Sequence, residues 1–305
     1  MPREFFKADG KPESRRDKAF RGKIEKAFRR QTQASEIPES AKQYLEIADD
    51  FPFAWLNQVF ERVYGKTMAG NFADLIGGAE NIKWDDAIQD VGSHQPLANV
   101  IRLNAVRLEN KLLRADEFKV EKNFGRKMLL ARVLIHEAVH VYSKIRGTGQ
   151  ELVRGVKKSG VLQVTSGLET QRLTIHRGSV VGEPSIESRD LNEGLVDLVA
   201  EDIFTLYLQE EGIKGLPQVE QFQQFLAAVA DPYKNQKFFI LDIVDRVSAD
   251  AGVDFGTAYQ GMIHQLFSGG VIAGDVETWI SEIVGHEAFE NIKKGTSTDL
   301  SDKKK

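Results

Sequence analysis

The segment Leu134-Ile-His-Glu-Ala-Val-His-Val141 lies inside a long apolar run with helical spacing. It contains two histidines four positions apart, His136 and His140, and Glu137 directly follows the first. On a helix, residues four apart share one face with Cβ atoms about 5–6 Å apart, so both imidazoles can bind one Zn²⁺ ion. Glu137 is turned off that line but stays on the metal side, where it can hold a zinc-bound water. We therefore expect a zinc site with Glu137 as the catalytic base.

The flanking sequence supports a helix around this motif. Residues 123–145 contain no proline and a single glycine near the start, and their apolar positions form a wide stripe that predicts burial. Gly147, which follows Lys144 and Arg146, is the expected end of the helix. The alternative is that the two histidines only pack or form hydrogen bonds on a structural helix.

Composition limits the kind of protein and the kind of metal site. The 305-residue chain has ordinary apolar and charged fractions for a globular protein and contains no cysteine. Thiolate ligands are therefore excluded, and a zinc site must use histidine and carboxylate. No apolar run approaches the roughly 20 residues that span a bilayer, and the N-terminus lacks the apolar segment of a secretory signal. We therefore expect a cytoplasmic chain without a transmembrane segment, although export by a specialised machine leaves no recognisable trace.

Positive charge is concentrated at the N-terminus, where residues 1–30 contain 11 Lys/Arg and 5 Asp/Glu. A basic arm can contact nucleic acid, an anionic membrane or a protein partner. It can also be a solvated helical arm whose phenylalanines pack on the body. Interleaved acids and the lack of a nucleic-acid-binding motif favour the solvated arm, so no nucleic-acid partner is expected.

A catalytic zinc site needs a third protein ligand. Arg146 occupies the position at which a longer form of the motif would supply another histidine, which leaves a carboxylate from elsewhere. Glu193 is the candidate because it begins a strongly apolar helix, and Gly194 beside it permits close helix packing. Asp197, one turn later on the same face, can accept the outer N–H of a zinc histidine. The alternative is that Asp190 and Glu193 form a capping box at the start of that helix.

The motif at His136 and the segment Leu191-Asn-Glu-Gly-Leu-Val-Asp197 together resemble the gluzincin metallopeptidases, which include thermolysin-like proteases and aminopeptidases. The resemblance covers these two motifs and the order strand, helix, insert, helix. It implies three zinc ligands, a general base and a carboxylate that supports a ligand histidine. The ligands are His136, His140 and Glu193, the general base is Glu137, and the supporting carboxylate is Asp197. Fifty-two residues lie between His140 and Glu193, more than in the best-known members, and an inserted hairpin would fill the excess.

The pattern of elements predicts an α+β fold that is predominantly α-helical, and the resemblance implies a zincin-like catalytic core. The chain divides into an arm at 1–35, a catalytic domain at 36–292 and a disordered tail at 293–305. Within the domain, a small sheet and the active-site helix extend to about residue 150, a hairpin insert covers 159–189, and a helical part follows at 190–292. Helices are expected near 40–49, 52–64, 190–210, 217–230, 235–250, 255–267 and 275–292.

These observations favour a zinc-dependent metallopeptidase that hydrolyses peptide bonds in a peptide or protein substrate. The strand expected at Val100–Leu103 is either the sheet edge on which that substrate pairs or an ordinary buried element. The oxyanion requires a donor besides zinc, and the candidates are Tyr259, His264 and His176. The alternative is a zincin-like binding or accessory module, including an exported effector, with little or no peptidase activity. Intact Glu137 argues against a purely structural zinc, which needs no base.

Overall fold

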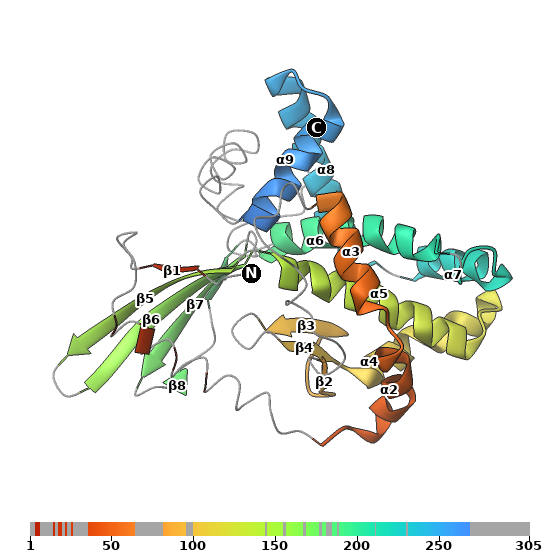
Figure 1. The fold of residues 1–305 in the computed structure, drawn as a ribbon, viewed down its shortest axis with the longest axis horizontal. Helices are drawn as coiled ribbons and strands as arrows, with labels where there is room; N and C mark the ends of the chain where they lie inside the picture. The colour runs from red at the N-terminus through yellow and green to blue at the C-terminus, as the bar shows by residue number, and fades with distance from the viewer. Residues whose placement is uncertain are drawn as a thin grey trace, which may run out of the picture.

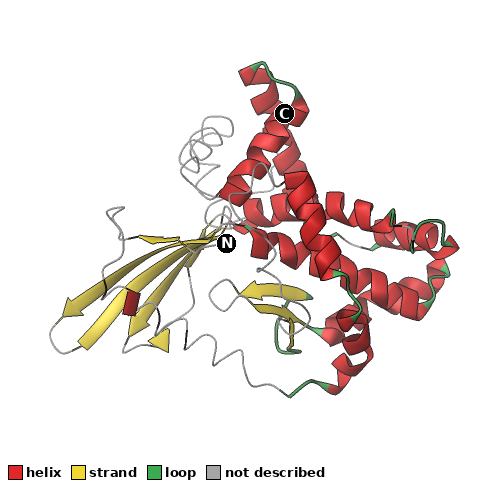
Figure 2. Cartoon of the chain, in the orientation of Figure 1, coloured by secondary structure: helices red, strands yellow, loops and turns green. Residues whose placement is uncertain are grey.

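The computed structural model has two parts, a helical body and a long sheet that extends away from it (Figure 1). Figure 2 shows the helices gathered in the body and most of the strands in the extended sheet. The fold is α+β and predominantly helical, as predicted. The structure describes residues 4–6, 15, 18–19, 22, 26, 36–64, 82–95, 100–143, 145–154, 157–166, 169–176, 179–180, 185–187, 189–210, 212–229 and 231–268.

The predicted motif helix is α5, Lys122–Tyr142, and most of its residues are buried. Its first turn is capped by Glu121, whose carboxylate accepts hydrogen bonds from the backbone N–H groups of Asn123 and Phe124. At the other end the Ser143 hydroxyl donates to the carbonyl of Val139, 2.8 Å away. Both ends of the helix therefore have their backbone groups satisfied by local side chains.

The expected helix end at Gly147 is wrong, because α5 stops at Tyr142 and strand β5 (Ile145–Arg154) begins three residues later. The chain turns out of the helix at Ser143, whose backbone is extended (φ −61°, ψ 134°). Gly147 lies inside β5, opposite Val164 of the neighbouring strand. A glycine after two basic residues is a common helix stop, but here strand pairing had already ended the helix.

The helices before α5 cover one side of it. These are η1 (Glu39–Ala41), α2 (Lys42–Asp49) and α3 (Phe53–Tyr64), which occupy the region where two amphipathic helices were expected. Figure 1 shows α3 crossing in front of α5. The ring of Phe60 on α3 packs against Tyr142 with centroids 4.2 Å apart, and the Tyr142 hydroxyl donates to Asn57. Aromatic packing thus fixes the C-terminal end of α5.

A three-stranded sheet lies beside α5 and is formed by β2 (Ile82–Trp84), β3 (Gly92–Gln95) and β4 (Val100–Leu103). β4 is the middle strand, parallel to β2 and antiparallel to β3. The edge-strand alternative for Val100–Leu103 is therefore wrong, and the buried-strand alternative is correct. β3, which the sequence did not predict, is the edge of this sheet that contacts α5. Alternating burial of Ile101 and Leu103 reports the buried face but not which strands pair.

Between the small sheet and α5, the helix α4 (Ala105–Lys111) and the 3₁₀ helix η4 (Leu112–Phe118) connect the two elements. Asn104 caps α4 by accepting a hydrogen bond from the backbone N–H of Arg107. The last turn of α4 packs near α5 and ends at Lys111. This brings a lysine from outside the two motif helices to the side of α5.

The second sheet, whose strands other than β1 lie between the two motifs in sequence, has the strand order β1-β5-β6-β7-β8, with β9 also paired to β7. The predicted hairpin is present as antiparallel β6 and β7, but β5 extends it by a further ten-residue strand. β1 is a strand parallel to β5, whereas the whole arm 1–35 was expected to be helical or mobile. The strands other than β5 are β1 (Glu4–Phe6), β6 (Lys157–Ser166), β7 (Glu169–His176), β8 (Ser179–Val180) and β9 (Ser185–Glu187).

Four helices follow the sheet, close to their predicted positions: α6 (Arg189–Leu208), α7 (Pro217–Ala228), α8 (Lys234–Ala251) and α9 (Phe255–Ser268). α6 packs along α5 and α8. A Cβ on Gly194 would lie 2.8 Å from the backbone carbonyl of Gln236, so the predicted close approach at this glycine is confirmed. The helix expected at 275–292 and the tail at 293–305 lie outside the described residues.

One continuous hydrophobic core joins the helices of the body, and α5 and α6 lie at its centre. Ile135, Ala138 and Val139 of α5 and Leu195, Val196 and Val199 of α6 are completely buried. None of the described helices combines the length and apolarity needed to cross a bilayer. The core therefore holds the two motif helices in a fixed relation, which positions the side chains between them.

Candidate metal centre

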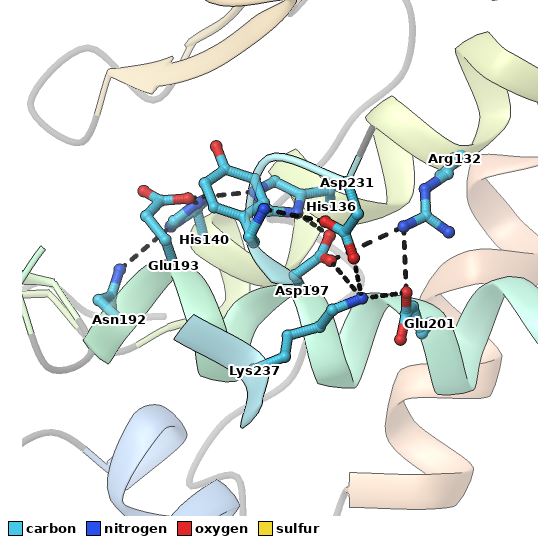
Figure 3. Close-up of polar contacts among 10 residues, drawn as sticks. Arg132, His136, His140, Asn192, Glu193, Asp197, Glu201, Asp231 and Lys237 are labelled. Carbon is cyan, nitrogen blue, oxygen red and sulfur yellow. Dashed lines mark hydrogen bonds and ion pairs between the residues drawn. The ribbon is translucent and has the colours of Figure 1, made fainter. Parts of the chain in front are cut away.

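Two helices bring the three expected ligands together. α5 carries His136 and His140, and α6 carries Glu193 (Figure 3). Glu193 Oε2 lies 3.3 Å from His136 Nε2 and 3.4 Å from His140 Nε2. One ligand atom from each residue lies within 4.8 Å of the other two. About a tenth of each side chain is exposed, so the cluster is nearly enclosed but still accessible from one side.

The spacing within this triad fits a zinc ion better than it fits direct hydrogen bonds. An N–H···O hydrogen bond is about 2.7–3.2 Å long, which is shorter than either contact to Glu193. Ligand atoms at about 2.0–2.1 Å from a tetrahedral Zn²⁺ are separated from each other by roughly 3.3 Å. Both contacts match that separation. Two imidazoles and one carboxylate are also a donor set that catalytic zinc uses, so the residues present fit this ion.

The outer contact of His136 favours a lone pair that faces Glu193. His136 Nδ1 lies 3.1 Å from Asp197 Oδ1, and a carboxylate only accepts, so in the neutral ring Nδ1 carries the hydrogen and Nε2 is the free acceptor. The outer nitrogen of the other ring, His140 Nδ1, lies 3.5 Å from the amide nitrogen of Asn192. Asp197 therefore has the outer contact to a ligand histidine that the sequence predicted.

The capping-box alternative for Glu193 is wrong. α6 begins at Arg189, so Asp190 already lies inside its first turn and Glu193 lies in the second. The Glu193 carboxylate turns to the imidazoles of α5 rather than back to the helix start. The packing of α5 against α6 determines the position of the Glu193 carboxylate. A capping pattern within one helix does not indicate how two helices pack.

Electrostatics of the site are dominated by buried carboxylates. Burial opposes the charged form of His136, but hydrogen bonds that its imidazolium donates to Asp197 and Glu193 outweigh burial and raise its pKa to about 10. Burial also opposes protonation of His140, yet the charge of Glu193 raises that pKa as well. For Glu193 burial favours the neutral acid, but the imidazoles hold its pKa well below the usual value. In the metal-free chain, protonated imidazoles thus neutralise the carboxylates. A bound divalent cation supplies the same positive charge in place of these protons.

Glu137 faces β3, where a glycine leaves room for it. A Cβ on Gly92 would lie 2.6 Å from Glu137 Oε1 and 2.8 Å from Val133 Cγ1, so a larger residue requires one of these side chains to move. Burial raises the pKa of Glu137. Among the described residues, none donates a hydrogen bond to Glu137 Oε2. A buried carboxylate oxygen without a protein donor is suited to accept a hydrogen from a water or a substrate.

Asn104 fixes the loop that carries Gly92 to this position. Its backbone N–H donates to the carbonyl of Val91, 2.9 Å away. Its side-chain amide donates to the carbonyls of Asp86 and Ile88, at 3.0 and 2.9 Å. Asn104 is itself buried, so these three bonds are shielded from water. The approach of β3 to Glu137 therefore depends on a side chain that the sequence analysis did not single out.

Two rings that the sequence analysis missed lie against the imidazoles. His94 is on β3, and its ring stacks over His140 with centroids 6.5 Å apart. Tyr233, before α8, stacks on His136 at 5.3 Å and 10°. Burial and the charge of Glu193 raise the pKa of the Tyr233 hydroxyl, so it remains a hydrogen-bond donor at neutral pH. No local pattern marks either residue, because each reaches the site through the pairing of elements distant in sequence.

Two of the three donor candidates named from the sequence, Tyr259 and His264, are not brought to this site. The Tyr259 hydroxyl donates to Asp202 Oδ2, 3.3 Å away, and Asp202 lies nine residues after Glu193, on the opposite face of α6. His264 lies on the same helix as Tyr259, and neither lines the cavity beside Glu137. His176 ends β7, where its backbone pairs with Ser179, and its side chain lies outside the described atoms.

A second group with metal-ligand spacing adjoins the first and consists of Asp197, Glu201 and Asp231. The ammonium of Lys237 lies among these carboxylates, 3.2 Å from Asp197 Oδ2 and 2.6 Å from Asp231 Oδ2, and also pairs with Glu201 (Figure 3). Burial opposes the charge on Lys237, but the surrounding carboxylates raise its pKa. A side-chain cation therefore neutralises this second group.

A cavity of about 770 Å³ opens beside Glu137 and follows α5 towards its N-terminal half. From α5 it is lined by Leu129, Arg132, Val133 and His136 as well as Glu137. Residues of the loop before α8, of α7 and of the segment before β3 complete the lining. Pockets that bind small ligands or peptide side chains typically measure about 300–1,000 Å³, so this one can hold a substrate segment.

No protein-family model, curated protein or solved structure matches the chain. The likeness to gluzincins is thus confined to the two sequence motifs. What the site can do follows from the chemistry of its residues.

Proposed function

We propose that the chain is a zinc-dependent metallopeptidase. The observation that carries the proposal is the meeting of two imidazole nitrogens, His136 Nε2 and His140 Nε2, at a single carboxylate oxygen of Glu193, at 3.3 and 3.4 Å. Beside it lies Glu137, a buried glutamate with a raised pKa. Ligands without a nearby base would suit a structural ion, whereas ligands with a base suit hydrolysis.

In this proposal His136, His140 and Glu193 hold the ion, and Asp197 orients His136 through its Nδ1 hydrogen. Bound zinc lowers the pKa of a coordinated water towards ~7 and polarises a carbonyl. Glu137 accepts the proton of the attacking water on its free Oε2 and then delivers it to the leaving amine. Its raised pKa brings it closer to neutrality, where one group can both accept and release a proton.

Two residues replace the donors named from the sequence. Tyr233 has a protonated hydroxyl near Glu193 and Glu137, as their effect on its pKa indicates. No described residue accepts from that hydroxyl, so it is available to the oxygen of a substrate carbonyl as negative charge develops. His94 projects from β3 next to His140 and offers a second donor on the other side. We assign the oxyanion contact to Tyr233 first, because it faces the cavity.

Support for a peptide substrate comes from β3. Among the described strands β3 is one of the two edge strands of the small sheet, and its Gly92 lies beside Glu137. An extended peptide can pair with such an edge through backbone hydrogen bonds, while the neighbouring cavity receives its side chains. A substrate without a peptide backbone would not use this edge.

The test has two stages, metal analysis and proteolysis. Purified protein, with and without chelator treatment, is analysed for bound metals by mass spectrometry, and one zinc per chain is expected. The zinc-loaded protein then digests a broad peptide library, beside Glu137→Gln and the exposed control Glu117→Gln. Glu137→Gln should keep its zinc and lose cleavage by several orders of magnitude, whereas Glu117→Gln should match wild type. Cleavage that persists in Glu137→Gln would refute the assigned base. Stoichiometric zinc with no cleavage by wild type would favour the binding or accessory module.

A further inference from the structure

The cavity beside Glu137 has charged groups on an otherwise apolar wall. Leu129, Val133, Phe225 and Leu226 supply apolar surface. Four cations also line it: Lys111 from α4, Arg132 from α5, and Lys234 and Lys237 from α8. In a space that can hold a substrate segment, the charges without a partner determine which substrate residues fit best.

Every acid on the cavity wall other than Glu137 is paired. Asp197 contacts His136 and Lys237, and Asp231 contacts Lys237. Glu201 pairs with Lys237 and lies 3.2 Å from Arg132. Asp90, at the mouth, pairs with the exposed Arg189 at 3.3 Å. Glu137 itself faces Gly92 and the proposed metal. A cationic substrate group would therefore have to displace a cation that is already held in place.

Lys111 differs from the other cations of this wall. Arg132 and Lys237 pair with carboxylates, and the exposed Lys234 lies over the ring of Phe238, 5.8 Å from its centroid. Lys111 lies in the last turn of α4, half-buried, and lines the cavity. No carboxylate of the described residues lies within ion-pair distance of its ammonium, whereas Arg132 and Lys237 each contact two or more. Burial and the nearby Arg132 lower its pKa, in agreement with an ammonium that lacks a direct counter-ion. The helix C-terminus favours a cation there but gives it no carboxylate.

We propose that the cavity receives a carboxylate-bearing residue of the substrate next to the scissile bond, with Lys111 as its counter-ion. This inference rests on the proposed peptidase function, because it takes the metal site as the point from which the substrate extends. The carboxylate belongs either to an acidic side chain or to the free C-terminus of the substrate. Both present the same chemistry to an ammonium.

The geometry along α5 relates the two ends of the cavity. Arg132, whose charge acts on Lys111, lies one turn of α5 before His136, a rise of about 5.4 Å. The chain of the substrate enters near Glu137, and its charged end must extend at least that far along the helix. A glutamate side chain has the length for this, and a shorter aspartate reaches less far. Lys111 thereby determines specificity and takes no part in bond cleavage.

Binding of metal-anchored probes tests the inference without relying on turnover. Three peptide-like hydroxamates are made that differ in one side chain, which ends in a carboxylate, a carboxamide or an ammonium. The hydroxamate attaches each probe to the zinc, so differences in Kd report the cavity. In wild type the carboxylate probe should bind roughly 10- to 100-fold tighter than the carboxamide probe, the value of one charge-assisted contact. The ratio should fall to near one in Lys111→Met and favour the ammonium probe in Lys111→Glu.

A matched control and a further probe complete the design. Lys127→Glu makes the same charge change on the exposed face of α5 and should keep the wild-type ratio. A loss of the ratio in that variant as well would overturn a direct contact with Lys111. A fourth probe, with a free α-carboxylate and an alanine side chain, is compared with its α-amide to separate the C-terminal source from the side-chain source. Equal binding of the carboxylate and neutral probes in wild type overturns the inference but does not contradict the proposed metal site. No binding of any hydroxamate overturns both.

Discussion

Two groups of ligand-type side chains adjoin along α6, which supplies Glu193 to one and Asp197 and Glu201 to the other, and they are neutralised in different ways (Figure 3). In the group of Asp197, Glu201 and Asp231, the ammonium of Lys237 lies among the three carboxylates. In the group of His136, His140 and Glu193, no lysine or arginine of the described chain makes an ion pair. In both groups the ligand atoms lie close enough together to hold one metal ion, yet only one group already contains a side-chain cation.

The difference shows that spacing alone does not identify a metal site. A buried cluster of carboxylates must be neutralised, and the chain does this with a lysine where it has one in reach. At the histidine group, neutralisation comes from protons on the imidazoles or from an added cation. Imidazoles release their protons to a metal readily, whereas the lysine ammonium has a raised pKa and stays charged. The histidine group is thus the one that can exchange its cation.

The largest expected contrast is in metal binding after the same substitution in each group. Glu193→Gln removes the oxygen anion that both imidazoles face, so zinc should fall from one per chain to a trace. The loss should exceed the ~10- to 100-fold effect of removing a partner outside the ligand set. Glu201→Gln, two turns along the same helix, should retain full zinc content. Competition with a chromogenic chelator measures both affinities, and equal losses in the two variants would contradict the contrast.

A smaller effect is expected in the pH dependence of stability. Folding raises the pKa of His136 from 6.5 to about 10, so the folded metal-free chain binds this proton more tightly than the unfolded chain. That contribution is fully present below pH 6.5 and is lost as the pH rises through 10. Across this window the free energy of unfolding of the chelated protein should decline by roughly 3–5 kcal/mol. Zinc-loaded protein has a metal in place of the proton and should be much less sensitive to pH.

Urea unfolding at a series of pH values, with chelator or with zinc, checks this expectation. Asp197 provides an internal reference in the same protein, since its pKa is lowered to about 2 and its stabilising effect disappears only in acid. Parallel curves for the chelated and zinc-loaded protein between pH 6.5 and 10 would mean that proton and metal do not compete at His136.

The sequence was informative where one helix face carries the pattern and uninformative where the site depends on pairing between elements. The meeting of His136, His140 and Glu193, the carboxylate beside His136 and the close approach at Gly194 were all predicted from the sequence of the two helices. β3 was missed because Gly92-Ser-His-Gln95 has no apolar alternation, and its position is maintained by Asn104. Tyr233 was missed because a loop residue before a helix gives no signal of the ring on which it stacks.

The same limit explains the wrong helix end and the wrong donors. β5 follows α5 almost directly, yet its Arg-Gly-Thr-Gly-Gln segment has weak strand propensity and resembles a turn. Pairing with β6 along the whole strand overrides that local preference. Tyr259 has the right chemistry for a donor, but helix packing turns it to Asp202. In each case the sequence indicated the local preference or the chemistry of a residue, but not which residues lie next to it in space.

The smallest expected effect concerns Glu137, which belongs to neither group and has no cation beside it other than the imidazoles. Burial raises its pKa, so its charged form is disfavoured in the folded metal-free chain. Above its unfolded pKa, near 4.5, this raises the free energy of the folded state, and Glu137→Gln should therefore stabilise the chelated protein at pH 7.5 by roughly 1 kcal/mol. Below pH 4 the carboxyl is neutral in both states, and the gain should disappear. Thermal unfolding at the two pH values, with Glu117→Gln as the exposed control, provides the comparison. Destabilisation of the chelated protein at pH 7.5 would mean that the Glu137 carboxylate is a structural partner of the imidazoles, and it would then be a poor candidate for a base.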